Sequence, residues 1–162
     1  DRDGTLNVDP GYLGDPTQVH FLPSVPEALT LLSEAGFLLL VVTNQSGIAR
    51  GLYAEAAVLA IHEEMNRQLA SLGVRLADLA FCPHLPAVLC ACRKPRPGLI
   101  TQLARTHQVE LSASVLVGDK PSDVRAGRAA GVGRTVLLQS AIEPAADYLA
   151  ADLLAAAHWI LR

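Results

Sequence analysis

Four short apolar segments that alternate with helical patterns constrain the fold of this 162-residue chain most strongly. They are FLLLVVT, DLAFC, SVLVGD and TVLL, at residues 37–43, 78–82, 114–119 and 135–138. Their length and their β-branched residues are typical of strands that are buried on both faces of a sheet. Strands that alternate with helices form parallel sheets. The sequence therefore predicts an α/β fold, with a Rossmann-like parallel sheet and helices on both faces.

Apolar residues at helical spacing predict helices over 24–36, 54–73, 97–107 and 121–131. The tail from Ala145 to Arg162 is rich in alanine and is predicted to be mostly one helix. Residues 1–20 are rich in Gly, Asp and Pro and are predicted as a loop. The length suits one domain over residues 1–162 and leaves no room for a separate cap domain.

Composition argues against several classes of partner. Lys and Arg total 13 and Asp and Glu total 16, so the net charge of −3 gives no sign of a nucleic-acid or anionic membrane partner. No uninterrupted apolar run approaches the roughly 18 residues of a membrane span, and no signal peptide is visible. The three cysteines share one short segment, unlike a secreted disulfide framework. We therefore expect a cytoplasmic protein, and we expect it to be a monomer.

Carboxylates gather at the ends of the predicted elements. DRDGT supplies Asp1 and Asp3, and GDKPSD supplies Asp119 and Asp123 after the third predicted strand. Crowded carboxylates repel one another unless a cation lies among them, and Mg²⁺ prefers oxygen ligands. Either motif alone would fit an ordinary turn. Because ligands bind at the carboxyl ends of parallel strands, the two motifs together predict a Mg²⁺ site.

Two further motifs suit a phosphate group. TNQSG follows the first predicted strand and offers hydroxyl, amide and backbone N–H donors. Arg93 and Lys94 offer a guanidinium, which can contact phosphate at two points, and a compact ammonium. Alone, the first motif would fit a loop that satisfies its own backbone, and the second a solvated surface pair.

The order of these motifs (DxD, then Thr43, then Lys94, then GDxxxD) resembles the haloacid dehalogenase (HAD) superfamily of phosphatases over nearly the whole chain. The resemblance implies that Asp1 is the nucleophile that forms an aspartyl-phosphate. It implies that Asp3 is the general acid and then the general base, with an elevated pKa in the substrate complex. Thr43 and Lys94 would hold the transferring phosphoryl group.

The same resemblance implies that Mg²⁺ is bound by Asp1, Asp119 and the backbone carbonyl of Asp3, with Asp123 as outer support. Enzymes of the superfamily carry an apolar strand immediately before the DxD motif, whereas this sequence starts at Asp1. We therefore expect the sequence to lack the first strand of the fold.

The segment CPHLPAVLCAC contains a candidate zinc site at Cys82, His84, Cys90 and Cys92. Three thiolates and one imidazole match the ligands of a tetrahedral structural Zn²⁺. A redox site would favour a C-x-x-C pair, which is absent, and a disulfide would leave one cysteine over. Chance clustering of reduced cysteines is the remaining alternative. The sequence thus predicts a small zinc-binding loop.

Within the superfamily, this zinc loop resembles those of the heptose 1,7-bisphosphate phosphatases and the histidinol-phosphate phosphatases. NVDPGY, VVTNQSGIARG, CRKPRPG and GDK resemble the heptose group. That likeness implies that Arg93 and Lys120 contact a second phosphate. It implies a substrate pocket that is also formed by Asp9, Pro10, Gly11, Tyr12, Thr43, Asn44, Gln45, Ser46 and Lys94.

The implied activity is Mg²⁺-dependent removal of the 7-phosphate of D-glycero-D-manno-heptose 1,7-bisphosphate, in ADP-heptose, lipopolysaccharide or surface-glycan precursor synthesis. Histidinol-phosphate phosphatase is the alternative, although the cations Arg93, Lys94 and Lys120 suit a bisphosphate better than a cationic amino alcohol. A nucleic-acid 3′-phosphatase is disfavoured by the acidic net charge and the few aromatic residues. A non-catalytic zinc-stabilised module would have no use for both Asp1 and Asp3.

Overall fold

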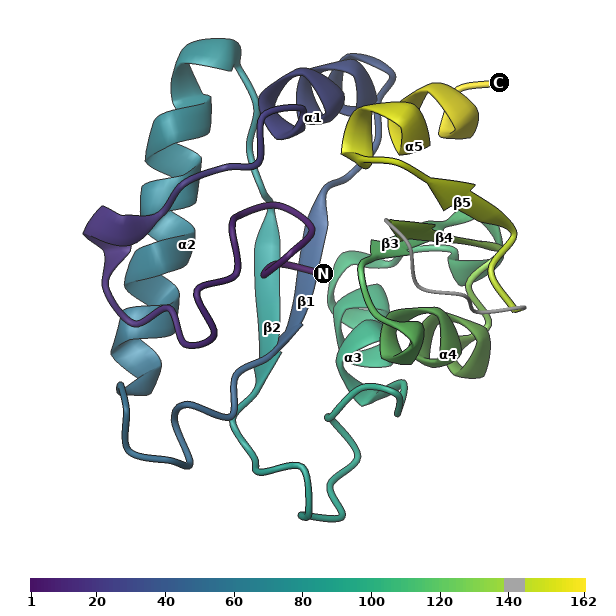
Figure 1. The fold of residues 1–162 in the computed structure, drawn as a ribbon. Coiled ribbons are helices and arrows are strands. Elements are labelled where there is room, and N and C mark those ends of the chain that lie inside the picture. Colours follow the sequence, from purple (N-terminus) through teal and green to yellow (C-terminus); the bar gives the residue numbers. More distant parts are fainter. Residues whose placement is uncertain (139–144) are drawn as a thin grey trace.

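The computed structural model describes residues 1–138 and 145–162, and the strands in these ranges are all parallel (Figure 1). β1 (Leu40–Asn44) pairs with β2 (Asp78–Cys82). A second set has the order β3 (Val115–Gly118), β4 (Arg134–Leu138) and β5 (Tyr148–Ala150). The prediction of an α/β fold with parallel strands is confirmed.

The helices are α1 (Val25–Glu34), α2 (Glu55–Leu69), α3 (Gly98–His107), α4 (Pro121–Ala130) and α5 (Leu153–Ile160). Short 3-10 turns lie at Pro16–Gln18, Ala70–Leu72 and Leu111–Ala113. One apolar cluster joins α1, α2 and α5 to β1 and β4, and a second joins α3 and α4 to β1 and β2. The helices therefore cover both faces of the strands, as predicted. Within the described residues, no helix is both long enough and apolar enough to cross a membrane.

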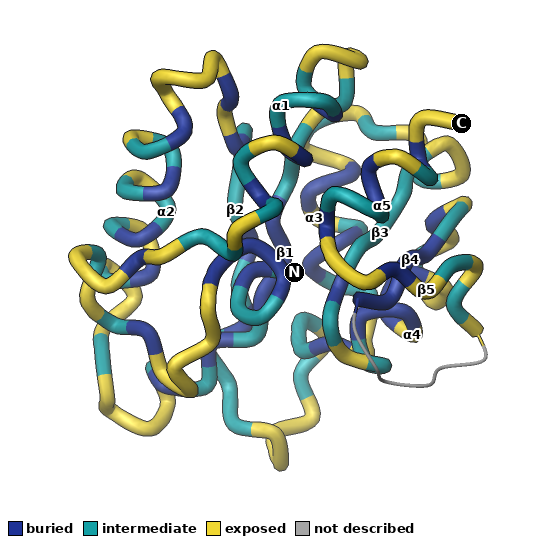
Figure 2. Tube along the Cα trace, turned by 45° about the horizontal axis from the view of Figure 1, so that its top comes forward, coloured by how far each residue is buried: buried dark blue, intermediate teal, exposed yellow. Residues whose placement is uncertain are grey.

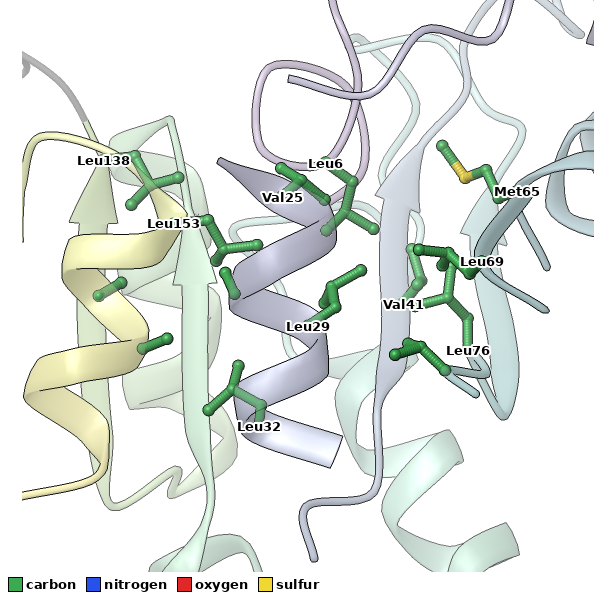
Figure 3. Packing of buried hydrophobic residues seen from close by; sticks show 14 of the residues in the cluster. Leu6, Val25, Leu29, Leu32, Val41, Met65, Leu69, Leu76, Leu138 and Leu153 are labelled. Atoms are coloured by element: carbon green, nitrogen blue, oxygen red, sulfur yellow. The ribbon is translucent and has the colours of Figure 1, made fainter. Parts of the chain in front are cut away.

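Helix α1 joins the two sets of strands through its buried face. Val25, Leu29 and Leu32 lie between Val41 of β1 on one side and Leu153 of α5 on the other (Figure 3). Burial of one such side chain contributes roughly 1.5–3 kcal/mol. The strands at the centre are buried or half-buried, and many of the connecting loops at the periphery are exposed (Figure 2). The strand ends that carry the polar motifs therefore rest on a packed base.

The prediction of one helix over most of the tail is wrong, because the three-residue strand β5 precedes α5. The ring of Tyr148 stacks on that of Trp159 with centroids 5.0 Å apart, which holds β5 against α5. Asp152 then starts α5 by accepting a hydrogen bond from the N–H of Ala155 at 2.8 Å. Pairing with β4 has thus overridden the helical preference of an alanine-rich segment.

The facing edges of β1 and β3 are not paired with each other in the described part of the chain. Apolar side chains line the space between them as two pockets, of about 330 Å³ on the α3 side and about 130 Å³ on the side of α1 and α5. The backbone nitrogen of Asp1 donates a hydrogen bond to the carbonyl of Val117, at 2.7 Å, near the carboxyl end of β3. The strand expected ahead of Asp1 stays a prediction. The single domain over residues 1–162 also stays a prediction.

Candidate active site

A pocket of about 480 Å³ collects polar side chains that include those following the carboxyl ends of β1 and β3. The substrate-pocket and catalytic residues predicted from the sequence all line it except Pro10. Asp119, the predicted metal ligand, is not part of the lining, whereas Tyr53 and Ser122 belong to it although the sequence did not single them out. The lining residues are Asp1, Asp3, Asp9, Gly11, Tyr12, Thr43, Asn44, Gln45, Ser46, Tyr53, Arg93, Lys94, Lys120 and Ser122.

Lys94 is a buried cation at the base of this pocket, with only 4% of its surface exposed. Its Nζ lies 2.9 Å from Asp1 Oδ1 and 2.5 Å from Asp123 Oδ1, and it donates to the carbonyl of Val42 at 3.0 Å. Burial lowers the pKa of Lys94 below its ordinary value, although the charge of Asp123 opposes the shift. The ammonium therefore fixes the carboxylate of Asp1 from one side.

Asn44, the last residue of β1, holds the backbone of Lys94. Its Nδ2 donates to the carbonyl of Lys94 at 3.2 Å, and its Oδ1 accepts from the N–H of Lys94 at 3.1 Å. Asn44 lies opposite Cys82 in the β1–β2 register, and the N–H of Gln45 donates to the carbonyl of Cys82 at 2.7 Å. Strand pairing thus sets the position of the cation. Asn44, predicted to contact substrate, has its amide engaged by the Lys94 backbone.

Asp119 lies where the DRDGT turn approaches the end of β3. Thr5 Oγ1 donates to Asp119 Oδ1 at 3.3 Å. Gly4 has a φ of +81°, and a Cβ on it would lie 2.5 Å from Asp119 Oδ2. A side chain at position 4 would therefore displace this carboxylate. Lys120 Nζ lies 3.6 Å from Asp119 Oδ2 and 3.5 Å from Asp9 Oδ2, so it links Asp119 to the loop that follows DRDGT.

The carboxylates fit a divalent cation. One oxygen each from Asp1, Asp119 and Asp123 lie within 4.8 Å of one another, and such oxygens are the ligands that Mg²⁺ prefers. Asp123 is already engaged, since Oδ1 pairs with Lys94 and Oδ2 accepts from the N–H of Lys120 at 3.0 Å, at the start of α4. Asp1 and Asp119 therefore offer the more available oxygens, and the outer role of Asp123 stays a prediction.

Asp3 is not a member of this carboxylate group, because its side chain is held by other residues. Burial alone would raise the pKa of Asp3, but the charge of Arg2 and hydrogen bonds from Arg2, Asn7 and Gln45 lower it below the ordinary value. Asp3 is thus a carboxylate in the free protein. The elevated pKa expected in the substrate complex stays a prediction.

The sequence did not reveal Tyr53 or the hydrogen bonds that hold Asp3 in place. Tyr53 Oη donates to Gln45 Oε1 at 2.6 Å, while Gln45 Nε2 donates to Thr43 Oγ1 and to Asp3 Oδ2, each at 2.8 Å. Gln45, predicted to contact substrate, is 2% exposed and has its amide engaged by these partners. A Cβ on Gly47 would lie 2.4 Å from the Tyr53 ring, which therefore needs a glycine there. Only folding brings these side chains together, so the local sequence carries no signal for the contacts between them.

The structure brings together Cys82, His84, Cys90 and Cys92, as predicted. Cys82 Sγ lies 3.1 Å from Cys92 Sγ and 3.6 Å from Cys90 Sγ, and His84 Nδ1 lies 3.3 and 3.5 Å from the sulfurs of Cys92 and Cys82. The three cysteines are not in disulfides. Ligands of a tetrahedral zinc, with Zn–S near 2.3 Å, are separated by roughly 3.5–3.8 Å, so the cluster could hold Zn²⁺ after a small expansion.

This loop also supports Arg93. The Arg93 Nη1 donates to the carbonyl of His84 at 3.2 Å, and Arg96 Nη1 donates to the carbonyl of Cys90 at 2.6 Å. A Cβ on Gly98 would lie 2.4 Å from the carbonyl oxygen of Ala91, so the loop closes tightly on the start of α3. The conformation of the cysteine segment therefore determines where the Arg93 guanidinium can reach.

Residues 91–160 match the family model described as HAD-hydrolase-like, so this part of the chain is similar to HAD-like hydrolases. The chain is 42% identical to the D-glycero-β-D-manno-heptose-1,7-bisphosphate 7-phosphatase of Yersinia pestis, over 100% of this chain and 87% of that protein. It is 40% identical to the protein of the same name from Escherichia coli K12, over 100% and 86%.

Solved structures agree with these relatives. The D,D-heptose 1,7-bisphosphate phosphatase from B. bronchiseptica, complexed with magnesium and phosphate, matches with a TM-score of 0.89 and 35% identity, over 99% of this chain and 95% of that one. The enzyme of that name from Burkholderia thailandensis matches with a TM-score of 0.73 and 30% identity, over 99% and 95%. The chain therefore belongs to the heptose-1,7-bisphosphate 7-phosphatase family of HAD-like hydrolases.

Proposed function

We propose that this chain is a Mg²⁺-dependent phosphatase that removes the 7-phosphate of D-glycero-β-D-manno-heptose 1,7-bisphosphate. The observation that carries the proposal is the Asp1 carboxylate, which lines a polar pocket and is held at 2.9 Å by the buried ammonium of Lys94. An anion so placed can meet a phosphoryl group beside a fixed positive charge. The names of relatives at 40–42% identity supply the substrate and favour the heptose over histidinol phosphate.

The reaction divides into two displacements. In the first, a carboxylate oxygen of Asp1 forms a bond to phosphorus while the bond between phosphorus and the sugar oxygen breaks, and Asp3 gives its proton to that oxygen. In the second, water attacks phosphorus and gives a proton to Asp3, and the bond to Asp1 breaks to release phosphate. Thr43 and Lys94 line the same pocket, and their proposed role is to hold the phosphoryl oxygens through both steps.

The proposed cofactors are a catalytic Mg²⁺ and a structural Zn²⁺. Asp1, Asp119 and the Asp3 carbonyl would hold Mg²⁺, whose charge offsets the repulsion between the Asp1 carboxylate and the phosphate. The four cysteine and histidine ligands would hold Zn²⁺, which fixes a loop too small for an apolar core of its own.

The pocket suits a substrate with phosphates at both ends. Arg93 and Lys120 line it together with Lys94. Lys94 would contact the phosphate that is removed, and Arg93 and Lys120 would contact the second phosphate. Asp9, Gly11 and Tyr12 lie in the same lining and would contact the sugar. Arg50 lies over the Tyr12 ring at 5.8 Å, which steadies that side chain.

We further propose that the enzyme acts as a cytoplasmic monomer on a sugar-phosphate precursor of lipopolysaccharide or other surface glycans. The clustered cysteines, none of them in a disulfide, favour a reducing compartment. The net charge of −3 argues against a nucleic-acid partner.

The test is phosphate release from the α and β anomers of the heptose bisphosphate and from histidinol phosphate, each with and without Mg²⁺. We expect Mg²⁺-dependent release from the β anomer, with phosphorus NMR of the product showing that the 1-phosphate remains. Asp1→Asn is the control and should release none. Faster turnover of histidinol phosphate, or loss of the 1-phosphate, would contradict the proposed substrate.

A further inference from the structure

The Asp3 carboxylate accepts four hydrogen bonds from three buried side chains. Arg2 donates through Nε to Oδ1 at 3.0 Å and through Nη2 to Oδ2 at 2.8 Å. Asn7 Nδ2 donates to Oδ1 at 3.0 Å, and Gln45 Nε2 donates to Oδ2 at 2.8 Å. The three donor residues are at most 2% exposed. The plane of the carboxylate is therefore fixed by the protein and not by solvent.

Arg2 differs from the other two donors in contacting both oxygens. Its guanidinium is planar, so a two-point contact sets the rotation of the carboxylate as well as its position. Asn7 and Gln45 each reach one oxygen and have other partners, the carbonyl of Val8 and the hydroxyl of Thr43.

The backbone of Arg2 is also fixed. Its N–H donates to Asp1 Oδ1 at 2.6 Å, and its carbonyl accepts from the N–H of Leu6 at 2.7 Å. One residue therefore joins the Asp1 carboxylate, through its backbone, to the Asp3 carboxylate, through its side chain. Any movement of Arg2 would change the spacing of both acids.

We propose that Arg2 is a positioning residue for the acid and base steps, because its two-point contact sets the position and plane of the Asp3 carboxylate from which proton transfer starts. To take up the proton that it gives to the leaving oxygen, Asp3 releases one of its four donors while Arg2 keeps the group in place. The inference rests on the proposed role of Asp3, and it goes beyond it by assigning a function to a residue that touches no substrate.

The experiment compares two aryl phosphates, p-nitrophenyl phosphate and phenyl phosphate, which need no sugar recognition. The nitrophenolate leaves as a stable anion, whereas phenolate depends more on a proton from the acid. The measured quantity is kcat/KM, which reports the steps up to loss of the phenol. For Arg2→Met we expect a fall of about 10²–10⁴ on phenyl phosphate, the usual range for a lost acid, and a much smaller fall on p-nitrophenyl phosphate.

Arg2→Lys separates orientation from charge, and it keeps the test informative if Arg2→Met does not fold. Lysine retains the cation but cannot make the two-point contact. We expect an intermediate loss with the same bias against phenyl phosphate, together with a stoichiometric burst of nitrophenolate because the base step is slowed too. Arg2→Lys with the activity of the unaltered enzyme on both esters would overturn the proposal.

Val136→Ala is the control, since Val136 is fully buried on β4 and lines no part of the pocket. It should lower stability while leaving the ratio of the two kcat/KM values unchanged. Equal losses on both esters in the Arg2 variants would show a merely structural role and would also overturn the proposal. Failure of the heptose substrate would leave this comparison intact, whereas equal rates of the unaltered enzyme and Asp3→Asn on phenyl phosphate would count against Asp3 as an acid.

Discussion

Replacing Lys94 by Met should lower the free energy of unfolding, because the ammonium compensates the buried charges of Asp1 and Asp123. Met fills most of the same space but carries no charge. Asp123 is 1% exposed, and without the ion pair at 2.5 Å it becomes an uncompensated buried anion. Breaking a buried pair in this way costs about 3–5 kcal/mol. For a chain of this length that corresponds to a fall of roughly 6–20 °C in Tm.

The assay is urea unfolding without added Mg²⁺, alongside turnover and bound-metal content. Lys94→Met should lose turnover and stability but keep its zinc, because Lys94 is not a ligand of the cysteine cluster. The double variant Lys94→Met/Asp123→Asn should be more stable than Lys94→Met alone, since the uncompensated anion is gone, and it should remain inactive. The reasoning would be refuted if Lys94→Met unfolded at the same urea concentration as the unaltered protein, or if the two stability losses simply added.

Four other outcomes are expected. Asp3→Asn should lower kcat by about 10²–10⁴ while calorimetry shows nearly unchanged substrate binding, and normal turnover would exclude Asp3 as the acid and base. Cys92→Ser should lower the zinc content and Tm and then, through loop disorder, the activity; full zinc occupancy would contradict a role as ligand. Gly118→Ala should lower the free energy of unfolding by about 1–3 kcal/mol in urea, because a Cβ would lie 2.4 Å from that of Asp123. The charge of Lys94 overcomes the effect of burial and lowers the pKa of Asp123 below 3.8 in the folded protein. The ionised Asp123 therefore stabilises the fold fully above pH 3.8, and this stabilisation is lost as the pH falls through the lower folded-state pKa. Asp123→Asn should remove this pH-dependent part of the acid-unfolding curve, and an unchanged curve would contradict the expectation.

The parts of the fold that follow local patterns could be predicted from the sequence. The four apolar runs all contain strands, although β1 begins at Leu40 and not at Phe37. The strand β5 was missed because its three residues pair with β4 and stack on Trp159, which are contacts made only after folding. Short strands carry too little pattern of their own to oppose an alanine-rich background.

The residues of the candidate site likewise fall into those that the sequence predicts and those that only the folded structure shows. Residues such as Asp119 and Cys82 were predicted because their chemistry and spacing are unusual in sequence. Arg2 and Tyr53 were not, because nothing local distinguishes a buried arginine from a solvated one. Gln45 was predicted as a substrate contact, yet folding directs its amide toward Asp3 and Thr43.

The register of β1 against β2 fixes the two ends of the segment 82–94, at Cys82 and Lys94. The exposed residues 86–89 between them are not held in this way. Cys82 faces Asn44 across the strands, and Asn44 holds the Lys94 backbone, so one residue added to β2 would move the first cysteine and disturb the site of the cation. Residues 86–89 are exposed, with Leu89 at 87%, and lie between His84 and Cys90, two of the proposed metal ligands. None of these four residues lines the pocket, and the loop reaches the pocket through Arg93, whose Nη1 donates to the carbonyl of His84. The turn can therefore change in length or composition with little effect on the position of Lys94, whereas β2 cannot.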